Sequence, residues 1–331
     1  MPRYALTVAY DGFDFCGWQK QEPLLVPSQA GTVPTLPINP DHILPAAETD
    51  TLGPGRVALR TVQAVLERAV REAVREPVIL TGASRTDAGV HALGQVAAFT
   101  CSGEETDAPQ DVPPPKNTPR NVGWPLSRGC DRLVKAINSR LPADVVVLGA
   151  CPVAPAFDPV RWAIRKQYVY SFRISRHRAM FDRNRVFCVH DALDLDRMRT
   201  AVLGLVGTHD CVGLTTAHHG RQSTVRTIEH CTIEEFAANP PGTLPDIDGS
   251  AKLVQIRVCG NGFLYNMVRI IAGTLLDVGR NRLSEDVFDR VFATGDRRLA
   301  GQTLPPSGLC LEWIEHSMGD GPMAETGDEQ A

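Results

Sequence analysis

The chain has 331 residues, of which 43% are hydrophobic and 22% are charged, and its formal net charge is −4. This composition is typical of a folded globular protein and excludes a largely disordered chain. A net negative charge by itself argues against a nucleic-acid binder, because a protein neutralises phosphates with a basic surface. No run of 18 apolar residues is present and residues 1–10 lack the apolar block of a signal peptide, so we expect a cytoplasmic protein that does not enter a membrane.

The first half of the chain alternates strand and helix patterns. Residues 3–10 alternate like a strand, and Thr61 can cap a helix whose apolar positions, from Val62 to Val74, are spaced by three and four. Four further elements are predicted, a short strand, a second strand, a helix and a third strand, at residues 78–80, 95–99, 132–137 and 144–148. The predicted order is therefore β-α-β-β-α-β.

The second half repeats this order loosely. Strands are predicted at residues 168–174, 225–236, 253–259 and 309–314. Helices are predicted at residues 195–205 and 263–278, and a third begins after Ser284 with Glu285 and Asp286 in its first turn, where the helix dipole favours acids. Two similar α+β lobes, each a largely antiparallel sheet with helices packed on it, fit this order best.

Four stretches interrupt the pattern. Three of them are rich in proline, at residues 22–59, 102–124 and 237–250, and the fourth is the C-terminal stretch at 319–331. Clustered prolines favour loops, so we interpret these stretches as insertions or ends on an ordinary scaffold. Together they carry a charge of −11, which leaves +7 on the rest of the chain. We expect an N-terminal lobe at 1–152, a C-terminal lobe at 153–316 and an acidic, disordered tail at 317–331. A basic scaffold with acidic additions is compatible with nucleic-acid binding.

Several common kinds of site have no support in the sequence. The nine cysteines include no CxxC pair, which disfavours a zinc knuckle or a disulfide framework and favours buried, reduced thiols. The motifs GxGxxG, GxxxxGK[ST], HExxH and GxSxG are all absent. We therefore expect no metal and no nucleotide cofactor.

The densest group of candidate functional residues is the sequence GASRTDAGVHA at 82–92, between two predicted strands. In an extended backbone Arg85 and Asp87 point the same way, so the cation could hold an ionised carboxylate in place. An Asp turn beside a surface arginine explains the same spacing.

Two other groups place cations in apolar surroundings. Arg269 lies within the apolar residues 263–271, where it needs a partner carboxylate or lies at a helix edge with its stem along the apolar surface. The sequence RKQYVY at 165–170 sets two aromatic residues beside two cations, which suits base stacking and phosphate contact. Core tyrosines on a strand with a basic edge fit that sequence equally well.

These residues and several shorter motifs together resemble the tRNA pseudouridine synthase A (TruA) family. The shorter motifs are, in chain order, YDG at 10–12, GWQKQ at 17–21, TVQ at 61–63, GQV at 94–96, KQYVY at 166–170, GFL at 262–264, MVR at 267–269 and GLCL at 308–311. The resemblance covers most of residues 3–315, and the RTDAGVH part of 82–92 is highly specific.

The resemblance implies the pseudouridine synthase fold and an isomerisation that needs no cofactor. Asp87 would be the nucleophile and would attack either the base or ribose C1′ of the target uridine. Arg269 would pair with Asp87 and keep it ionised, and Arg85 would help to hold the base flipped out of its stem. Tyr168 would stack on the uracil and serve in proton transfer, and the remaining implied substrate-binding residues are Lys166 and His91.

The substrate implied by the resemblance is the anticodon stem-loop of tRNA, at nucleotides 38 to 40, bound by a homodimer. One departure concerns residues 157–160, which read Phe-Asp-Pro-Val where the family commonly has Phe-His-Ala-Arg. A synthase that acts on another RNA or another tRNA position is therefore an alternative. A non-catalytic RNA-binding protein on the same scaffold is a second alternative.

Overall fold

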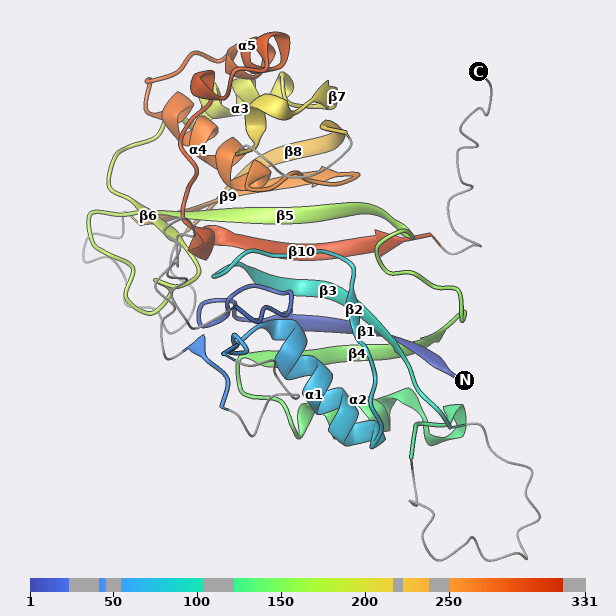
Figure 1. Ribbon diagram of the computed structural model, residues 1–331. Helices are drawn as coiled ribbons and strands as arrows, with labels where there is room; N and C mark the ends of the chain where they lie inside the picture. The colour runs from blue at the N-terminus through green and yellow to red at the C-terminus, as the bar shows by residue number, and fades with distance from the viewer. Residues whose placement is uncertain (24–41, 46–54, 104–121, 217–222, 238–250, 318–331) are drawn as a thin grey trace, which may run out of the picture. The chain divides into compact units, whose positions relative to one another are not determined.

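The computed structural model describes residues 1–23, 42–45, 55–103, 122–216, 223–237 and 251–317 (Figure 1). The larger part of the predicted insertions and nearly all of the predicted acidic tail lie outside the described residues. The chain divides into two compact units. Unit 1 contains Met1–Gly89, Gly94–Ala163 and His316–Ala331, and unit 2 contains Val90–Leu93 and Ile164–Glu315. None of the described helices has the length and apolar character needed to span a membrane.

The sheet of unit 1 has the strand order β4-β1-β3. Strand β1 (Arg3–Tyr10) pairs antiparallel with β4 (Val145–Val153), with an irregularity at Thr7/Val8, and the two-residue β2 (Thr81–Gly82) pairs antiparallel with β3 (His91–Thr100). Helix α2 (Cys130–Asn138) packs on β4 and on α1 (Val62–Val74), and the short η3 (Leu126–Arg128) precedes it. The apolar side chains that face inward from α1 are almost completely buried.

Helix α1 begins where its cap was predicted, because the Thr61 hydroxyl accepts a hydrogen bond from the Ala64 amide (3.4 Å). The predicted strand at 78–80 is wrong, and the strand in this region is β2. Side chains of α1 take the place of a strand partner: Arg71 Nε donates to Val78 O (2.9 Å) and Glu67 Oε2 accepts from Leu80 N (2.9 Å). Backbone groups satisfied in this way do not need a sheet ladder.

The sheet of unit 2 has the strand order β10-β5-β9-β8-β7, with β6 pairing parallel to β5. Its long strands are β5 (Ala163–Ile174), β8 (Val225–Ala237), β9 (Lys252–Gly260) and β10 (Leu309–His316). Its short strands are β6 (Phe187–Val189) and β7 (Gly207–Asp210), which the sequence patterns missed. The first residues of β3 also belong here, since His91 and Ala92 pair parallel with Cys310 and Leu311.

Unit 2 contains the helices α3 (Leu195–Leu203), α4 (Met267–Gly279) and α5 (Val287–Thr294) and the short turns η4 (Val212–Leu214), η5 (Arg297–Leu299) and η6 (Pro306–Gly308). Helix α3 packs on α4 and on β8, as Figure 1 shows. Helix α4 is buried on almost every side, with eleven of its thirteen residues buried.

Two predicted helix starts are wrong. Helix α4 begins at Met267 instead of residue 263, because Asn266 adopts the left-handed conformation (φ 59°), which a helix cannot continue through. Helix α5 begins at Val287, so Glu285 and Asp286 precede its first turn, and Glu285 instead forms an ion pair with Arg197 (2.8 Å). The predicted burial of the cysteines holds for Cys101, Cys211, Cys231 and Cys259 but is wrong for Cys151, which is exposed; the other four are half-buried.

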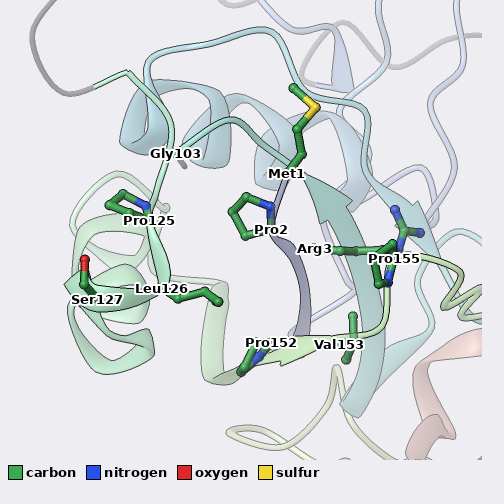
Figure 2. A pocket seen from close by; sticks show the side chains of 10 residues that line it. All are labelled: Met1, Pro2, Arg3, Gly103, Pro125, Leu126, Ser127, Pro152, Val153 and Pro155. Carbon is green, nitrogen blue, oxygen red and sulfur yellow. The ribbon is translucent and has the colours of Figure 1, made fainter. Parts of the chain in front are cut away.

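A hollow of about 470 Å³ opens in unit 1 beside the first residues of β1 (Figure 2). Prolines 2, 125, 152 and 155 line it together with Arg3 and apolar side chains. The Arg3 guanidinium donates to Phe157 O (2.8 Å) and Thr100 Oγ1 (2.9 Å). None of the predicted site residues lines this hollow.

Both units are mixed α+β structures with largely antiparallel strands, and the predicted fold class is confirmed. The pairs β5·β6 and β3·β10 are parallel.

Candidate active site

The 82–92 motif begins with the last residue of β2, continues through the connecting loop and ends in the first two residues of β3, and the first residues of the loop are bound to β3. The Ala83 amide donates to Val96 O (2.8 Å). The fully buried Gln95 side chain bonds Ser84 twice, accepting from its amide at Oε1 (3.1 Å) and donating to its carbonyl from Nε2 (2.5 Å). The backbone before Arg85 is therefore fixed by a side chain from the GQV motif.

The second half of the loop is bound to the segment that follows β1. The Trp18 amide donates to Thr86 O (3.0 Å), and the Gly89 amide donates to Phe15 O (3.2 Å). The hydroxyl groups of Tyr10 and Thr86 share a buried hydrogen bond of 2.8 Å. The YDG and GWQKQ motifs thus hold the loop that carries Asp87.

Gly17 makes this close approach possible. It has φ +90°, and a Cβ atom there would lie 2.7 Å from Thr86 O. Any other residue would be strained in its backbone and would collide with the loop.

Thr86 is buried while its neighbour Arg85 is exposed and its neighbour Asp87 is half-buried. The bonds on both sides of Asp87 fix the backbone of this half-buried residue. An anchored carboxylate of this kind suits a nucleophile, which must be held in one orientation toward its substrate.

Tyr168 and Lys166 lie on β5 in unit 2, where they pair with Val258 and Gly260 of β9. The ring of Tyr168 is buried and meets the ring of Phe263 edge to face, with centroids 5.3 Å apart. The structure thus brings together the KQYVY and GFL motifs, which lie about 95 positions apart in the sequence. Lys166 is half-buried.

The two other residues of the 165–170 motif singled out above have structural contacts. Tyr170 is fully buried and donates to Pro305 O (2.8 Å), and burial raises its pKa well above the usual range. Arg165 forms ion pairs with Glu315 and with Glu229 (3.0 Å) and lies over the ring of Trp313. For these two residues the interpretation as a core tyrosine and a basic strand edge is the better one.

Arg269 lies in the first turn of α4 and is half-buried. Its Nε donates to Leu304 O (2.6 Å) and its Nη1 donates to Asn266 Oδ1 (2.7 Å). The side-chain nitrogen Nδ2 of Asn266 in turn donates to Thr216 Oγ1 (3.2 Å). Leu304 O and Asn266 Oδ1 are neutral, so these two bonds orient the guanidinium group without cancelling its charge.

His91 is the first residue of β3 and is buried, with Nε2 2.7 Å from Asn184 O. Its predicted contact with substrate stays a prediction. The predicted site residues therefore fall into two sets. Arg85 and Asp87 lie in unit 1, and His91, Lys166, Tyr168 and Arg269 lie in unit 2. The predicted pairing of Asp87 with Arg269 joins the two sets and also stays a prediction.

Residues 157–161, which depart from the family pattern, form a tight turn. Asp158 Oδ1 accepts from the amides of Val160 (2.8 Å) and Arg161 (3.1 Å). The His316 ring packs on Phe157, with centroids 5.3 Å apart, and bonds Pro159 O (2.9 Å). Asp158 therefore has a structural role in this chain.

Asn266 and the carbonyl of Leu304, which orient Arg269, were not predicted from the sequence. Asn266 directly precedes the MVR motif and is one of the residue types that tolerate positive φ, which is the signal that could have identified it. Within the described ranges, no group of three or more His, Cys, Asp or Glu side chains could hold a metal ion.

Known proteins are similar to this chain over nearly all of its length. Residues 201–316 match the sequence model of a family described as tRNA pseudouridine synthase. The tRNA pseudouridine synthase A of Shouchella clausii is 34% identical over 319 residues, which cover 96% of this chain and 94% of that protein. The proteins of the same name from Limosilactobacillus fermentum (34% over 314 residues, 94% and 95%) and Myxococcus xanthus (32% over 326 residues, 98% and 96%) are similar. The chain belongs to the tRNA pseudouridine synthase A family, which are isomerases.

Proposed function

We propose that this chain converts uridine to pseudouridine at nucleotides 38 to 40 of the tRNA anticodon stem-loop, with Asp87 as the nucleophile. The proposal is supported by membership of the family. The observation that carries it is the anchored 82–92 loop, in which Gln95, Trp18 and Tyr10 fix the backbone around a half-buried Asp87.

The chemistry needs a carboxylate and no redox partner. If Asp87 attacks ribose C1′, the C1′–N1 bond breaks and uracil is released within the site. The ring then turns, C5 bonds to C1′ as the carboxylate leaves, the C5 proton is lost and N1 gains a proton. If Asp87 attacks the base instead, it forms a covalent adduct with the uracil ring. The C1′–N1 bond is then again exchanged for a C1′–C5 bond, and the carboxylate leaves. The atoms are conserved and Asp87 is regenerated, so the reaction is an isomerisation.

Each other site residue has a role in this proposal. Arg269, whose guanidinium plane is fixed by Leu304 O and Asn266, pairs with Asp87 and keeps it ionised. Arg85, exposed beside Asp87, holds the flipped nucleotide outside its stem. Tyr168 stacks on the uracil and takes part in the proton transfer at C5, while Lys166 and His91 contact the RNA. The working form is a homodimer.

The test compares Asp87→Asn with Asp14→Asn, which makes the same change at an exposed aspartate of unit 1. We expect Asp87→Asn to bind tRNA like the wild type and to lose at least about a thousandfold in pseudouridine formation. Asp14→Asn should keep full activity. Binding is measured by filter retention. Pseudouridine has the same mass as uridine, so it is first tagged with a carbodiimide and then mapped by mass spectrometry of the tRNA.

Substantial turnover by Asp87→Asn would remove Asp87 as the nucleophile. Pseudouridine at nucleotides other than 38 to 40 in the wild-type reaction would overturn the proposed position.

A further inference from the structure

Residues 176–185 form a loop in which four arginines occur within ten positions, against one acid. We propose that this arginine loop binds the phosphate backbone of tRNA and that Phe181 stacks on an unpaired base. The inference rests on the proposed function, because it concerns how the same substrate is held.

The arginine loop connects two parallel strands of unit 2. Phe172–Ile174 of β5 pair with Phe187–Val189 of β6, so the chain must cross back over the length of the strands between them. Both ends of the crossing are held: the Ser175 amide donates to Val189 O (3.0 Å), and the Ala179 amide donates to Cys188 Sγ (3.1 Å). These hydrogen bonds anchor the base of the loop to the sheet.

The single acid of the loop is directed inward. Asp182 Oδ2 forms an ion pair with Arg173 Nη1 (3.2 Å), and the Arg173 side chain is only 8% exposed. The outward-facing charges are Arg176, Arg178, Arg183 and Arg185, all exposed, as is His177. The solvent side of the loop is thus cationic, and a cationic surface attracts phosphates.

Two large apolar side chains stand among these cations. Met180 is 66% exposed and Phe181 is 69% exposed. An exposed aromatic residue beside arginines is typical of surfaces that bind single-stranded nucleic acid, where bases stack on rings and cations meet phosphates. Arginine, methionine and aromatic residues also occur in protein–protein interfaces, so it is the net positive charge of the loop, four arginines against one acid, that favours RNA over a protein partner.

A hydrogen bond also connects the arginine loop to His91, which is part of the 82–92 motif. Asn184 O lies 2.7 Å from Nε2 of His91, and His91 follows Asp87 by four residues. A substitution that alters the loop surface without disturbing Asn184 leaves this connection in place.

The experiment compares two double substitutions that remove the same charge. Arg178→Ala with Arg183→Ala changes the arginine loop, and Arg199→Ala with Arg290→Ala changes exposed arginines elsewhere in unit 2. For the loop variant we expect tRNA binding to weaken about tenfold and the slope of log K against log salt to fall by about 1.4, at about 0.7 per lost contact with single-stranded RNA. The control pair should leave the slope unchanged, and turnover at saturating tRNA should stay at the wild-type value in both.

Phe181 is tested against Phe236, another phenylalanine of unit 2 with an exposed side chain. Phe181→Ala should weaken binding about tenfold with no change in the salt slope, whereas Phe236→Ala should bind like the wild type.

Equal losses in the two double variants, or wild-type binding by the loop variant with an unchanged melting temperature, would overturn the proposed surface. A wild-type protein that makes no pseudouridine at nucleotides 38 to 40 would overturn the proposed function instead, and the binding comparison would still decide whether the loop binds tRNA.

Discussion

The hydroxyl groups of Tyr10 and Thr86 form a buried hydrogen bond one residue away from the proposed nucleophile. Thr86 is further fixed by its carbonyl, which accepts from the Trp18 amide. Because a displacement of about 1 Å at a reacting group can slow catalysis strongly, we expect this bond to matter for turnover as well as for stability.

We predict that Tyr10→Phe and Thr86→Val each destabilise the protein by about 1–2 kcal/mol, because each removes the buried hydrogen bond between the two hydroxyl groups. The double variant should cost less than the sum of the two, since it removes both hydroxyls. Turnover should fall in all three while tRNA binding is retained. Urea unfolding and single-turnover kinetics measure these quantities, and strictly additive costs with unchanged turnover would contradict a positioning role.

In the proposed function Asn266 is a second positioning residue, which would act on substrate through its hydrogen bond to Arg269. Its φ of 59° is one that glycine also adopts, so Asn266→Gly should keep the fold while removing the oxygen that accepts from Arg269 Nη1. We predict a fall in kcat of about tenfold in this variant.

The same substitution in an Arg269→Met background separates this role from a structural one. If Asn266 works by orienting the guanidinium group, Asn266→Gly should cause no further loss there. An equal loss in both backgrounds would show that Asn266 acts independently of Arg269. Asn266→Ala should behave worse than Asn266→Gly in both, because alanine is strained at positive φ.

At the scale of elements, the sequence predicts those that depend on periodicity and capping. Helix α1 illustrates this, with its apolar stripe and its Thr61 cap at the predicted position. The errors arise where side chains from distant elements satisfy the backbone. Val78 and Leu80 have a strand-like composition, but Arg71 and Glu67 of α1 bond their backbone groups and the strand forms at Thr81–Gly82 instead. A periodic sequence pattern does not predict such hydrogen bonds between a side chain and the backbone of another element.

The candidate site shows the same division. The 82–92 loop and Arg269 stand out in the sequence because charged residues lie beside strand-forming or apolar residues. The way in which these residues are held does not follow from the sequence, because Gln95, Tyr10 and Leu304 O act through hydrogen bonds that depend on tertiary structure. The start of α4 was missed because the left-handed backbone of Asn266 is a single-residue property within a continuous apolar pattern.

At the scale of the whole chain, the net charge of −4 conceals an uneven distribution. The four proline-rich or terminal stretches carry −11 and the rest of the chain +7. The arginine loop lies in that basic remainder, with its one acid paired inward. An overall negative charge is therefore compatible with a locally cationic surface, because association with RNA depends on the local field.

The buried thiols make the stability of the protein depend on pH in the alkaline range. Burial raises the pKa of Cys101, Cys211 and Cys259 to about 11 and that of Cys231 to about 12, from an ordinary value of 9.0. Each folded-state pKa is raised, so below pH 9 both states hold the proton and the full stability is present. Above pH 9 the unfolded chain loses the proton while the folded chain keeps it, and stability falls until pH reaches the folded pKa.

Cys231→Ala isolates one of these thiols. At about pH 7.5 the variant should be less stable than the wild type, because it lacks a packed sulfur atom. By about pH 10.5 the ionisation of Cys231 in the unfolded wild type should have lowered the wild-type free energy of unfolding by about 2 kcal/mol relative to that of the variant. The alanine variant has no thiol to ionise at this position. Urea unfolding of both proteins at the two pH values measures the difference. A stability gap between them that stays constant or widens with pH would contradict a buried, protonated Cys231.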